Sequence, residues 1–373
     1  MSGRRTADVP EMKLPTSTRP DPAEVPGLRW GVLGAGWIAS EMVHAIEVGE
    51  HGSTQQQVVA VGSRDLGRAQ AFVDEHCGAH VREHGPVRAH GSYADLVTDP
   101  DVDVVYVATP PSEHLEHALL AVRAGKHVLV EKAFTADAAQ ARETVAAIRE
   151  AGVFAMEAMW SRFLPHYDVV RQVLDLGLLG ELSTVLADHG QRLWPDGPRR
   201  LADPALAGGS LLDLGIYPLS FASMVLGGID RVVAAGTLTD EGVDARVAMS
   251  VRGPSGAVGS LSCDMSTRTP TTAVIAGRWA RLGLDGEFYG PTTMRLVGSD
   301  DVVLDEMTGD PVEMHRGLRH ETCEVALRVH AGETESPLMP STSPSPSWST
   351  WTPSAPARLT PPSRYDVLPA AGS

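Results

Sequence analysis

The first half of the chain alternates short apolar runs with segments whose apolar residues recur at helical spacing. Glycine, serine or proline turns follow the runs, and a helix is predicted after each turn. The predicted strands are residues 28–33, 58–62, 102–109, 127–130 and 153–158, and the helices between and after them end near residues 48, 76, 124 and 150. Because strands that alternate with helices form right-handed crossovers, the pattern predicts an α/β fold with a Rossmann parallel sheet.

The pattern changes after Ala158. A helix is predicted over residues 163–176, and a second, mostly apolar helix over 206–226. Segments of alternating character, most of them separated by glycine turns, occupy residues 182–188, 231–238, 245–251, 256–264, 272–276, 281–286 and 293–297. Such segments are typical of an antiparallel sheet. We therefore expect two domains, a dinucleotide-binding domain at 28–150 and an α+β domain at 151–340.

Both ends of the chain have compositions typical of disorder. Residues 1–27 include a polar, proline-rich stretch and are interpreted as a disordered leader. Residues 341–373 are rich in Ser, Thr and Pro and carry one acid, Asp366, and no lysine, so a packed helix is not expected there. Codons for parts of residues 340–349, read one base out of phase, can spell Leu-Asp-Glu and Met-Val. We therefore hypothesise that this disordered tail is a frameshift product, which resequencing would test.

Composition narrows the classes of partner. The 373 residues carry a formal net charge of -16, which argues against nucleic acid or an anionic membrane as the main partner. No apolar run approaches the roughly 20 residues that span a bilayer. Three cysteines lie far apart, and the four histidines between residues 76 and 90 lack the spacing of metal ligands, so neither a disulfide framework nor a metal site is expected. We expect a cytoplasmic protein.

A glycine motif, Gly34-Ala35-Gly36-Trp37-Ile38-Ala39, lies between the first predicted strand and its helix. Gly34 permits a tight turn, Gly36 lets a pyrophosphate approach the backbone, and Ala39 lets the helix pack closely on the strand. The helix N-terminus then offers free amides to phosphate. Alone, this motif also fits an ordinary turn, but its place at the first strand–helix junction favours dinucleotide binding.

The end of the second predicted strand indicates which dinucleotide is bound. An acid directly after this strand would bind a ribose 2′-hydroxyl, whereas an arginine suits a 2′-phosphate. Here Ser63 and Arg64 occupy the tip and Asp65 follows them. A hydroxyl with a guanidinium makes a good phosphate clamp, so NADP is favoured over NAD. In the alternative interpretation, Arg64 merely starts a solvated helix and Asp65 is its N-cap.

Two further positions carry candidate chemistry. Glu131 and Lys132 end an apolar strand, where ligands of an open α/β sheet bind, although an isolated pair of this kind is more often a solvated strand end. In the apolar helix, Asp213 and Tyr217 are four residues apart and are expected to share one buried face. In the plainer interpretation, Asp213 caps or pairs internally and Tyr217 is a half-exposed core residue. Opposite a strand-end lysine, the pair fits a substrate site better.

These residues together resemble a known family. The glycine motif, Ser63-Arg64, Glu131-Lys132 and the stretch from Gly208 to Tyr217 are similar to the Gfo/Idh/MocA oxidoreductases. Residues 156–165 and Tyr217 resemble its dihydrodiol dehydrogenase and D-xylose 1-dehydrogenase branch. The likeness runs from about residue 28 to 340. It departs from the usual family pattern at Ala133, where proline is usual, and at Tyr217, where histidine is usual.

The resemblance implies a fold, a reaction and a set of site residues. The fold is a Rossmann domain with a C-terminal α+β domain, whose large open-faced antiparallel sheet commonly forms a homodimer. The reaction is transfer of a hydride between NADP, with NAD as the alternative, and a hydroxyl of a sugar or trans-diol. Cofactor-binding residues are expected at Gly34, Gly36, Trp37, Ile38, Ser63, Arg64, Thr109, Pro110, His114, Glu131 and Lys132, and substrate-binding residues at Trp160, Arg162, Trp194 and Asp213.

The hypothetical mechanism assigns catalysis to Lys132, Asp213 and Tyr217. Tyr217 accepts the proton of the substrate hydroxyl, cationic Lys132 stabilises the resulting phenolate, and Asp213 orients substrate or tyrosine. Two alternatives stay open: a cofactor-binding sensor or inactive family member, and another family chemistry such as inositol dehydrogenation.

Overall fold

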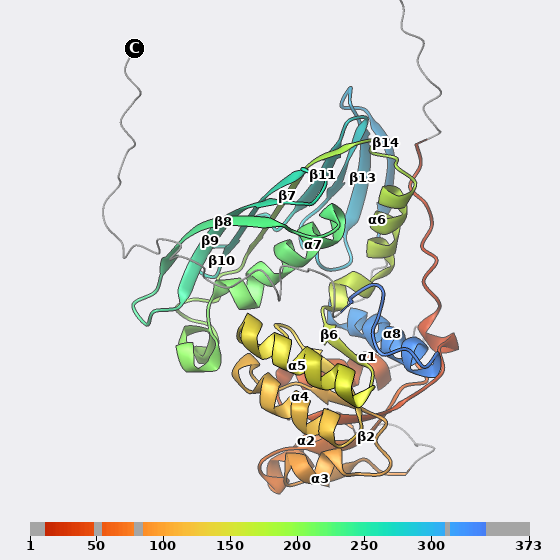
Figure 1. Cartoon of the computed structure of the whole chain (residues 1–373), viewed down its shortest axis with the longest axis vertical. Coiled ribbons are helices and arrows are strands. Elements are labelled where there is room, and N and C mark those ends of the chain that lie inside the picture. The colour runs from red at the N-terminus through yellow and green to blue at the C-terminus, as the bar shows by residue number, and fades with distance from the viewer. Residues whose placement is uncertain (1–11, 48–53, 78–84, 310–313, 341–373) are drawn as a thin grey trace, which may run out of the picture.

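The computed structural model describes residues 12–47, 54–77, 85–309 and 314–340. Two halves are stacked along the long axis, each built on one sheet (Figure 1). The lower half holds a six-stranded sheet and the upper half an eight-stranded sheet. This arrangement confirms the predicted fold class, a parallel Rossmann sheet followed by an α+β unit.

The six-stranded sheet is parallel throughout and has the order β3-β2-β1-β4-β5-β6. Its strands are β1 (Arg29–Leu33), β2 (Gln57–Gly62), β3 (Arg88–His90), β4 (Val104–Val107), β5 (His127–Glu131) and β6 (Ala155–Ala158). The helices that follow them are α1 (Trp37–Glu47), α2 (Leu66–His76), α3 (Tyr93–Val97), α4 (His114–Arg123) and α5 (Ala138–Ala151). The central strands are buried along almost their whole length, which explains their continuous apolar runs.

The eight-stranded sheet has the order β14-β13-β12-β11-β7-β10-β9-β8. Its strands are β7 (Leu182–Gly190), β8 (Arg231–Leu238), β9 (Asp244–Arg252), β10 (Val258–Asp264), β11 (Ala273–Gly277), β12 (Ala280–Leu284), β13 (Thr293–Gly298) and β14 (Val303–Thr308). All neighbours are antiparallel except β7 and β10, which run parallel. Burial alternates along β9, as expected for a sheet covered on one face.

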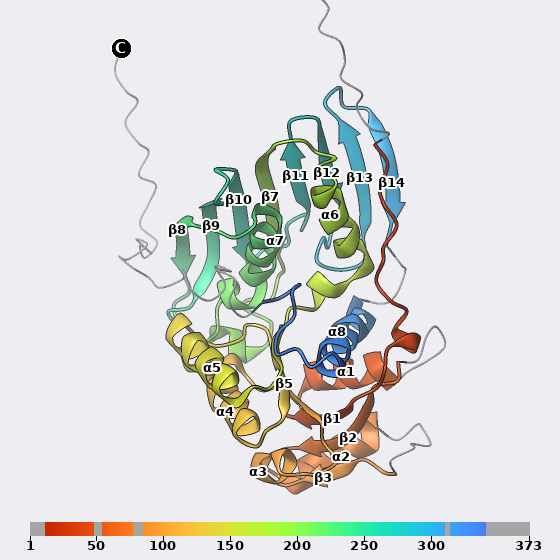
Figure 2. The same ribbon diagram turned by 45° about the vertical axis from the view of Figure 1, so that its right-hand side comes forward.

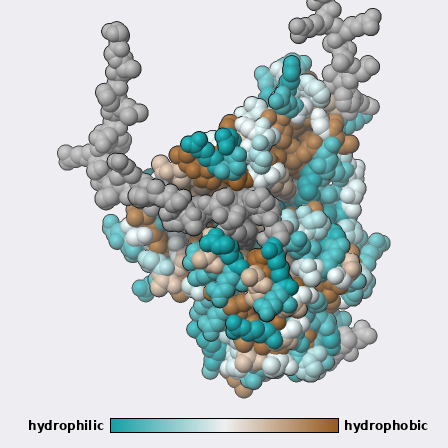
Figure 3. Space-filling model, viewed as in Figure 1, coloured by the Kyte–Doolittle hydropathy of each residue, from teal (hydrophilic) through white to brown (hydrophobic). Residues whose placement is uncertain are grey.

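One face of this sheet is covered by α6 (Pro165–Asp175) and α7 (Ile216–Leu226) (Figures 1 and 2). Helix α7 is buried along nearly all its length and forms the centre of the upper core. Its extension, Pro204–Leu226, is long and apolar enough to cross a membrane, but 83% of its apolar window is buried inside the protein, as in a core helix. On the side of the molecule seen in Figure 3, hydrophobic and hydrophilic residues are interspersed over both halves.

The N-terminal segment corrects one expectation. Residues 1–27 were predicted to be disordered, but residues 12–27 lie along β14, α6 and α8 (Leu318–His330). The backbone amides of Leu14 and Thr18 donate to the carboxylates of Asp305 and Asp168, at 2.8 and 2.7 Å. Acceptors distant in sequence therefore order a segment that is polar by composition. Residues 1–11 and the tail 341–373, where disorder was also predicted, lie outside the described residues.

The C-terminal part of the described chain returns to the lower half. Helix α8 packs against α1, beside the parallel sheet (Figures 1 and 2). A short segment after α8 then runs to Pro340, with the Ser336 hydroxyl donating to Glu324 on α8 at 2.6 Å. Residues beyond 150 thus contribute β6 and α8 to the nucleotide-binding half.

Candidate active site

A cavity of about 350 Å³ lies at the carboxyl ends of β1, β2, β4 and β5. This is where an open parallel sheet binds its ligands. Most of the predicted cofactor residues line it, namely Gly34, Gly36, Trp37, Ile38, Ser63, Arg64, Thr109, Pro110, Glu131 and Lys132. Asp213 closes the end next to Lys132.

The glycine turn fits a dinucleotide pyrophosphate. Gly34 has φ +108°, and a Cβ there would lie 3.0 Å from the carbonyl oxygen of Ala108, so a side chain is excluded. A Cβ on Gly36 would meet no atom within 4 Å and would instead occupy the open cavity. Helix α1 begins at the next residue and directs its free amides and positive dipole end toward the same space.

The end of β2 supplies the cations expected for a ribose 2′-phosphate. Arg64 and Arg68 both line the cavity beside the buried Ser63. The side chain of Arg64 is 74% exposed, and its guanidinium lies 3.6 Å from the Glu113 carboxylate. The guanidinium of Arg68 donates to the Ala35 carbonyl at 3.1 Å. Asp65 accepts from the Arg68 amide at 2.8 Å and is the N-cap of α2. The carboxylate is therefore used for capping, while the two guanidinium groups face the cavity.

At the end of the cavity formed by Lys132, the side chains of Lys132, Asp213 and Arg200 form an ion-pair cluster. Lys132 donates from Nζ to the Asp213 carboxylate at 3.2 Å and to its carbonyl oxygen at 2.9 Å, and Arg200 donates to the same carboxylate oxygen at 3.2 Å. Burial opposes the charge of Lys132, but Asp213, Tyr217 and Glu131 together outweigh it and raise the pKa of the lysine. Burial likewise opposes the charge of Asp213, yet Lys132 and Arg200 hold its pKa below the usual value. Lys132 is therefore an ammonium in the free protein.

Tyr217 lies behind this cluster and is absent from the described residues that line the cavity. Its side chain is 8% exposed, and its hydroxyl accepts a hydrogen bond from Nε1 of Trp160 at 3.1 Å. Lys132 Nζ lies 5.3 Å from the ring centre, over the ring. Burial raises the pKa of Tyr217, and the lysine offsets only part of that rise. Lys132 therefore acts on the phenol in the predicted direction, but in the free protein burial keeps the pKa of Tyr217 above its usual value.

Two predicted cofactor residues have structural partners. The Glu131 carboxylate faces the cavity but accepts from the Tyr106 hydroxyl and from the Lys132 amide. His114 is fully buried, and its ring nitrogens face the carbonyl oxygens of Thr109 and Ala133, at 2.7 and 2.9 Å. His114 therefore lies outside the cavity lining, where it holds together the two loops that end β4 and β5.

The four predicted substrate residues do not lie together around this cavity. Trp160 is buried behind Tyr217, outside the cavity lining. The guanidinium of Arg162 is used inside the protein, where it donates to the hydroxyl and carbonyl of Ser220 and to the carbonyl of Leu338. Trp194 lines a different cavity, described below. Of the four, only Asp213 borders the space beside Lys132.

Arg68 and Arg200 border the cavity and were not predicted. Arg68 had a readable signal, because it lies in the first turn of the helix that follows Ser63 and Arg64. Arg200 had none: it lies in the long connection between β7 and α7, and only the fold brings it to Asp213.

Comparisons with known proteins agree with this geometry. Residues 28–159 match the GFO_IDH_MocA model, described as an oxidoreductase family with an NAD-binding Rossmann fold, and residues 167–283 match the GFO/IDH/MocA C-terminal domain. Trans-1,2-dihydrobenzene-1,2-diol dehydrogenase from Bos taurus is 37% identical over 321 residues, covering 84% of this chain and 91% of that protein. The enzyme of the same name from Oryctolagus cuniculus is 40% identical, covering 83% and 92%.

Solved structures show the same fold. KijD10, a 3-ketoreductase from Actinomadura kijaniata in complex with NADP and TDP-benzene, superposes with a TM-score of 0.69 at 28% identity, covering 83% of this chain and 91% of that one. Both family models and the curated relatives confirm the resemblance that the sequence motifs indicated. The chain therefore belongs to the Gfo/Idh/MocA family of oxidoreductases.

Proposed function

We propose that this chain is an NADP-dependent dehydrogenase that acts on a hydroxyl group of a sugar or trans-diol. One observation carries the proposal: the Lys132–Asp213 ion pair closes a cavity whose remaining walls fit a dinucleotide. The names of the curated relatives support a diol hydroxyl as substrate, and the NADP complex of the related reductase supports the cofactor.

Different residues around the cavity fit different parts of the cofactor. Gly34, Gly36 and the N-terminus of α1 would hold the pyrophosphate, and Arg64 with Arg68 would hold the 2′-phosphate. When bound, the nicotinamide supplies the acceptor or donor of a hydride. The substrate carbon that exchanges this hydride must then lie near the Lys132 end of the cavity.

Lys132 is the group that handles the substrate proton. In carbonyl reduction its ammonium would donate a proton to the substrate oxygen, and in hydroxyl oxidation its neutral amine would accept the proton of the substrate hydroxyl. Asp213 orients the lysine, and Tyr217 packs behind both. This assignment replaces the tyrosine base inferred from sequence.

The test is to mix the purified protein with NADP, and separately with NAD, and with a panel of aldoses and trans-diols. Reduction of the nicotinamide is followed by its absorbance. We expect turnover with NADP and its loss in Lys132→Met, whose unbranched side chain is one atom shorter and uncharged. Tight NADP binding without turnover of any aldose or diol would contradict the proposal and favour a cofactor-binding sensor.

We propose, further, that two copies of the chain pair through the uncovered face of the eight-stranded sheet. Leu186, Val233 and Val258 are exposed on its strands. Exposed apolar residues on a sheet face favour association. Light scattering on the wild type and on a Val233→Lys, Val258→Lys variant tests this: a dimer that becomes a monomer is expected, and a wild-type monomer would contradict it.

A further inference from the structure

A second cavity, of about 610 Å³, adjoins the first one. The connection between β7 and α7 supplies most of its walls, including Trp194, Arg199 and Arg200, and Glu241 borders it from the turn between β8 and β9. Arg200 lines both cavities. The guanidinium of Arg200 also contacts Asp213, the ion-pair partner of Lys132.

The two cavities together have more volume than a small sugar or diol needs. Ligand sites of roughly 300–1,000 Å³ bury most of a drug-sized molecule. A small sugar whose hydroxyl reaches Lys132 needs only the space beside Lys132 and Asp213 and would leave the second cavity empty. A substrate that uses both must extend past Arg200.

The charges of the second cavity indicate what that extension is. Within the described part of the chain, the guanidinium of Arg199 has no ion-pair partner, and that of Arg200 pairs only with Asp213. The Asp203 carboxylate accepts from the Ala205 amide at 2.9 Å and is used as a helix cap. Glu241 is the remaining acid of the lining. Two arginines are therefore available to an anion, against one free carboxylate.

We propose that the second cavity is a subsite for an anionic substituent of the substrate, a carboxylate or a phosphate, bound by Arg199 and Arg200. Guanidinium groups bind both anions through paired hydrogen bonds, and the Trp194 ring offers an apolar wall to the carbon skeleton. The inference rests on the proposed function, because it takes the substrate to be a sugar or related polyol whose reacting hydroxyl lies at Lys132.

The position of Arg200 connects recognition to the reaction site. An anion in the second cavity competes with the Asp213 carboxylate for this guanidinium. When Arg200 turns to the anion, Asp213 keeps Lys132 as its only ion-pair partner among the described residues. Charged substrates are therefore expected to gain in kcat/KM, and not only in affinity.

Three ligands that share one ring test the subsite: a neutral hexose, its uronate and its 6-phosphate. Their binding to the protein loaded with NADPH is measured by calorimetry, since NADPH and a hydroxyl substrate do not react. Their oxidation with NADP is measured separately. We expect at least one of the charged ligands to bind about tenfold more tightly than the hexose, equivalent to about 1.4 kcal/mol. The better of the two identifies the carboxylate or the phosphate as the natural group.

Variants of one loop provide the comparison. Arg199→Ala should remove most of the preference for the charged ligand, because only Arg200 remains to bind the anion, and Arg199→Lys should retain more of it. Arg192→Ala is the matched control, because Arg192 belongs to the same loop, is 73% exposed, pairs with Asp196 and lies outside the cavity lining. It should keep the full preference.

The outcomes separate this inference from the proposed function. Equal binding of all three ligands, or an Arg199→Ala variant that weakens all three equally, overturns the subsite. Turnover of neutral sugars or diols without any charge preference keeps the proposed function and removes the subsite. Tight, Arg199-dependent binding of a charged sugar without turnover keeps the subsite and removes the proposed reaction.

Discussion

Lys132 and Asp213 are 81 residues apart in the chain, yet Nζ of the lysine donates to both the side-chain and the main-chain oxygen of the aspartate. The lysine follows β5, and the aspartate lies in the π-helical turn Leu211–Gly215 that precedes α7. Single π-turns are frequent at functional sites. Here the wider turn also explains why Asp213 faces the cavity while Tyr217 does not: residues four apart stack in an α-helix, but not across a π-turn with i→i+5 bonds.

Replacing Asp213 by Asn should shift the pH dependence of oxidation to lower pH. The Asp213 carboxylate raises the pKa of Lys132, so removing its charge lowers that pKa. Oxidation requires the neutral amine, and its rate therefore rises as pH passes through the lysine pKa. The rising limb of kcat/KM should appear at lower pH in the variant than in the wild type, measured from pH 6 to 11.

The exposed Asp230 pairs with Arg252 on β9 of the eight-stranded sheet and provides the control for that shift. Asp230→Asn should leave the pH profile in place. A profile that moves to higher pH in Asp213→Asn would contradict the assignment of Lys132 as proton carrier.

Lys132→Met and Tyr217→Phe should differ strongly in activity. Loss of a general acid or base typically costs roughly 10²–10⁴-fold in rate, which we expect for the lysine. The tyrosine hydroxyl is buried and contacts Trp160, and we assign it no role in proton transfer. Its removal should therefore lower kcat by less than about tenfold. Steady-state kcat and NADP binding, followed by fluorescence, measure both. Equal losses of kcat in the two variants would instead support Tyr217 as the group that transfers the proton.

Arg64→Ala with Arg68→Ala should reduce the preference for NADP over NAD. Hydrogen bonds to charged groups are worth about 1.5–3 kcal/mol, so the loss of the clamp should weaken NADP binding about 10- to 100-fold. Binding of NAD, which lacks the phosphate, should change little. Arg149→Ala, an exposed arginine on α5, is the control for loss of positive charge. Equal weakening of both cofactors would place the two arginines elsewhere on the dinucleotide.

The sequence predicts some of these features because they depend on local geometry. Buried parallel strands give continuous apolar runs, and the turn at Gly34 requires a positive φ, so both are readable in the chain. Strand β3 was missed because its three residues are half-buried at the sheet edge and show no apolar run. Strand β14, at the edge of the other sheet, was missed as well.

The errors in the site have a different cause. Arg162 binds Ser220 and Leu338, which are 58 and 176 positions away, and no local pattern shows that a guanidinium is used in this way. Arg200 likewise reaches Asp213 only through the fold. Composition was also misleading for residues 12–27, because the acceptors that order them lie on distant elements.

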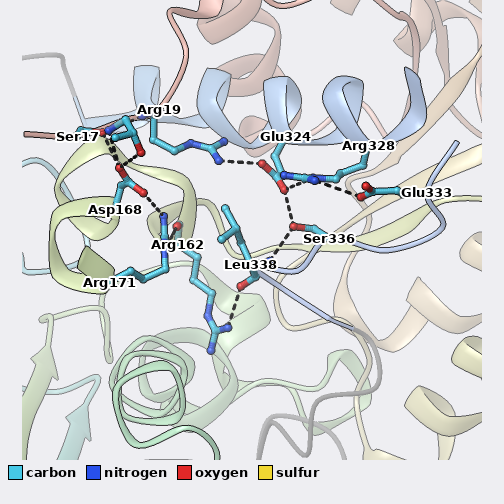
Figure 4. A network of polar contacts seen from close by, with 11 residues as sticks. Ser17, Arg19, Arg162, Asp168, Arg171, Glu324, Arg328, Glu333, Ser336 and Leu338 are labelled. Carbon is cyan, nitrogen blue, oxygen red and sulfur yellow. Dashed lines mark hydrogen bonds and ion pairs between the residues drawn. The ribbon is translucent and has the colours of Figure 1, made fainter. Parts of the chain in front are cut away.

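Arg19 should contribute measurably to stability, because it joins the N-terminal segment to α8 (Figure 4). Its guanidinium donates to Glu324 at 2.9 Å, with side chains only 9% and 0% exposed. Arg19→Ala leaves one carboxylate oxygen without this partner and should lower the free energy of unfolding by about 1–3 kcal/mol in urea titrations. Arg281→Ala, which breaks an exposed pair with Asp301, should cost at most about 1 kcal/mol.

The effect of Arg19→Ala should also depend on pH. Burial opposes the charge of Glu324, but the Ser336 hydroxyl and Arg19 lower its pKa below the usual value. The stabilisation is therefore complete above the unfolded pKa of about 4.3 and is lost as pH falls through the folded value. The gap between variant and wild type should close in acid. A gap that stays constant down to pH 3 would show that Arg19 acts through packing alone.

Glu157 should have the opposite pH dependence. It lies on β6, is 3% exposed, and accepts from the Phe134 amide at 3.2 Å, while its other oxygen has no described partner. Burial raises its pKa to about 8. Between the unfolded value of about 4.3 and that folded value, the folded state holds a proton that the unfolded chain has lost. Stability from this group therefore falls as pH rises, by at most about 1.4 kcal/mol per pH unit.

Glu157→Gln removes this dependence, because the amide keeps the shape of the protonated carboxyl and does not ionise. Relative to the wild type, the variant should gain stability steadily from pH 5 to pH 8, measured as the difference in free energy of unfolding at each pH. Glu150→Gln, an exposed position on α5, should show no such trend. A difference independent of pH would mean that Glu157 has the same proton occupancy in the folded and unfolded chains, and that a cation reaches it in the folded state.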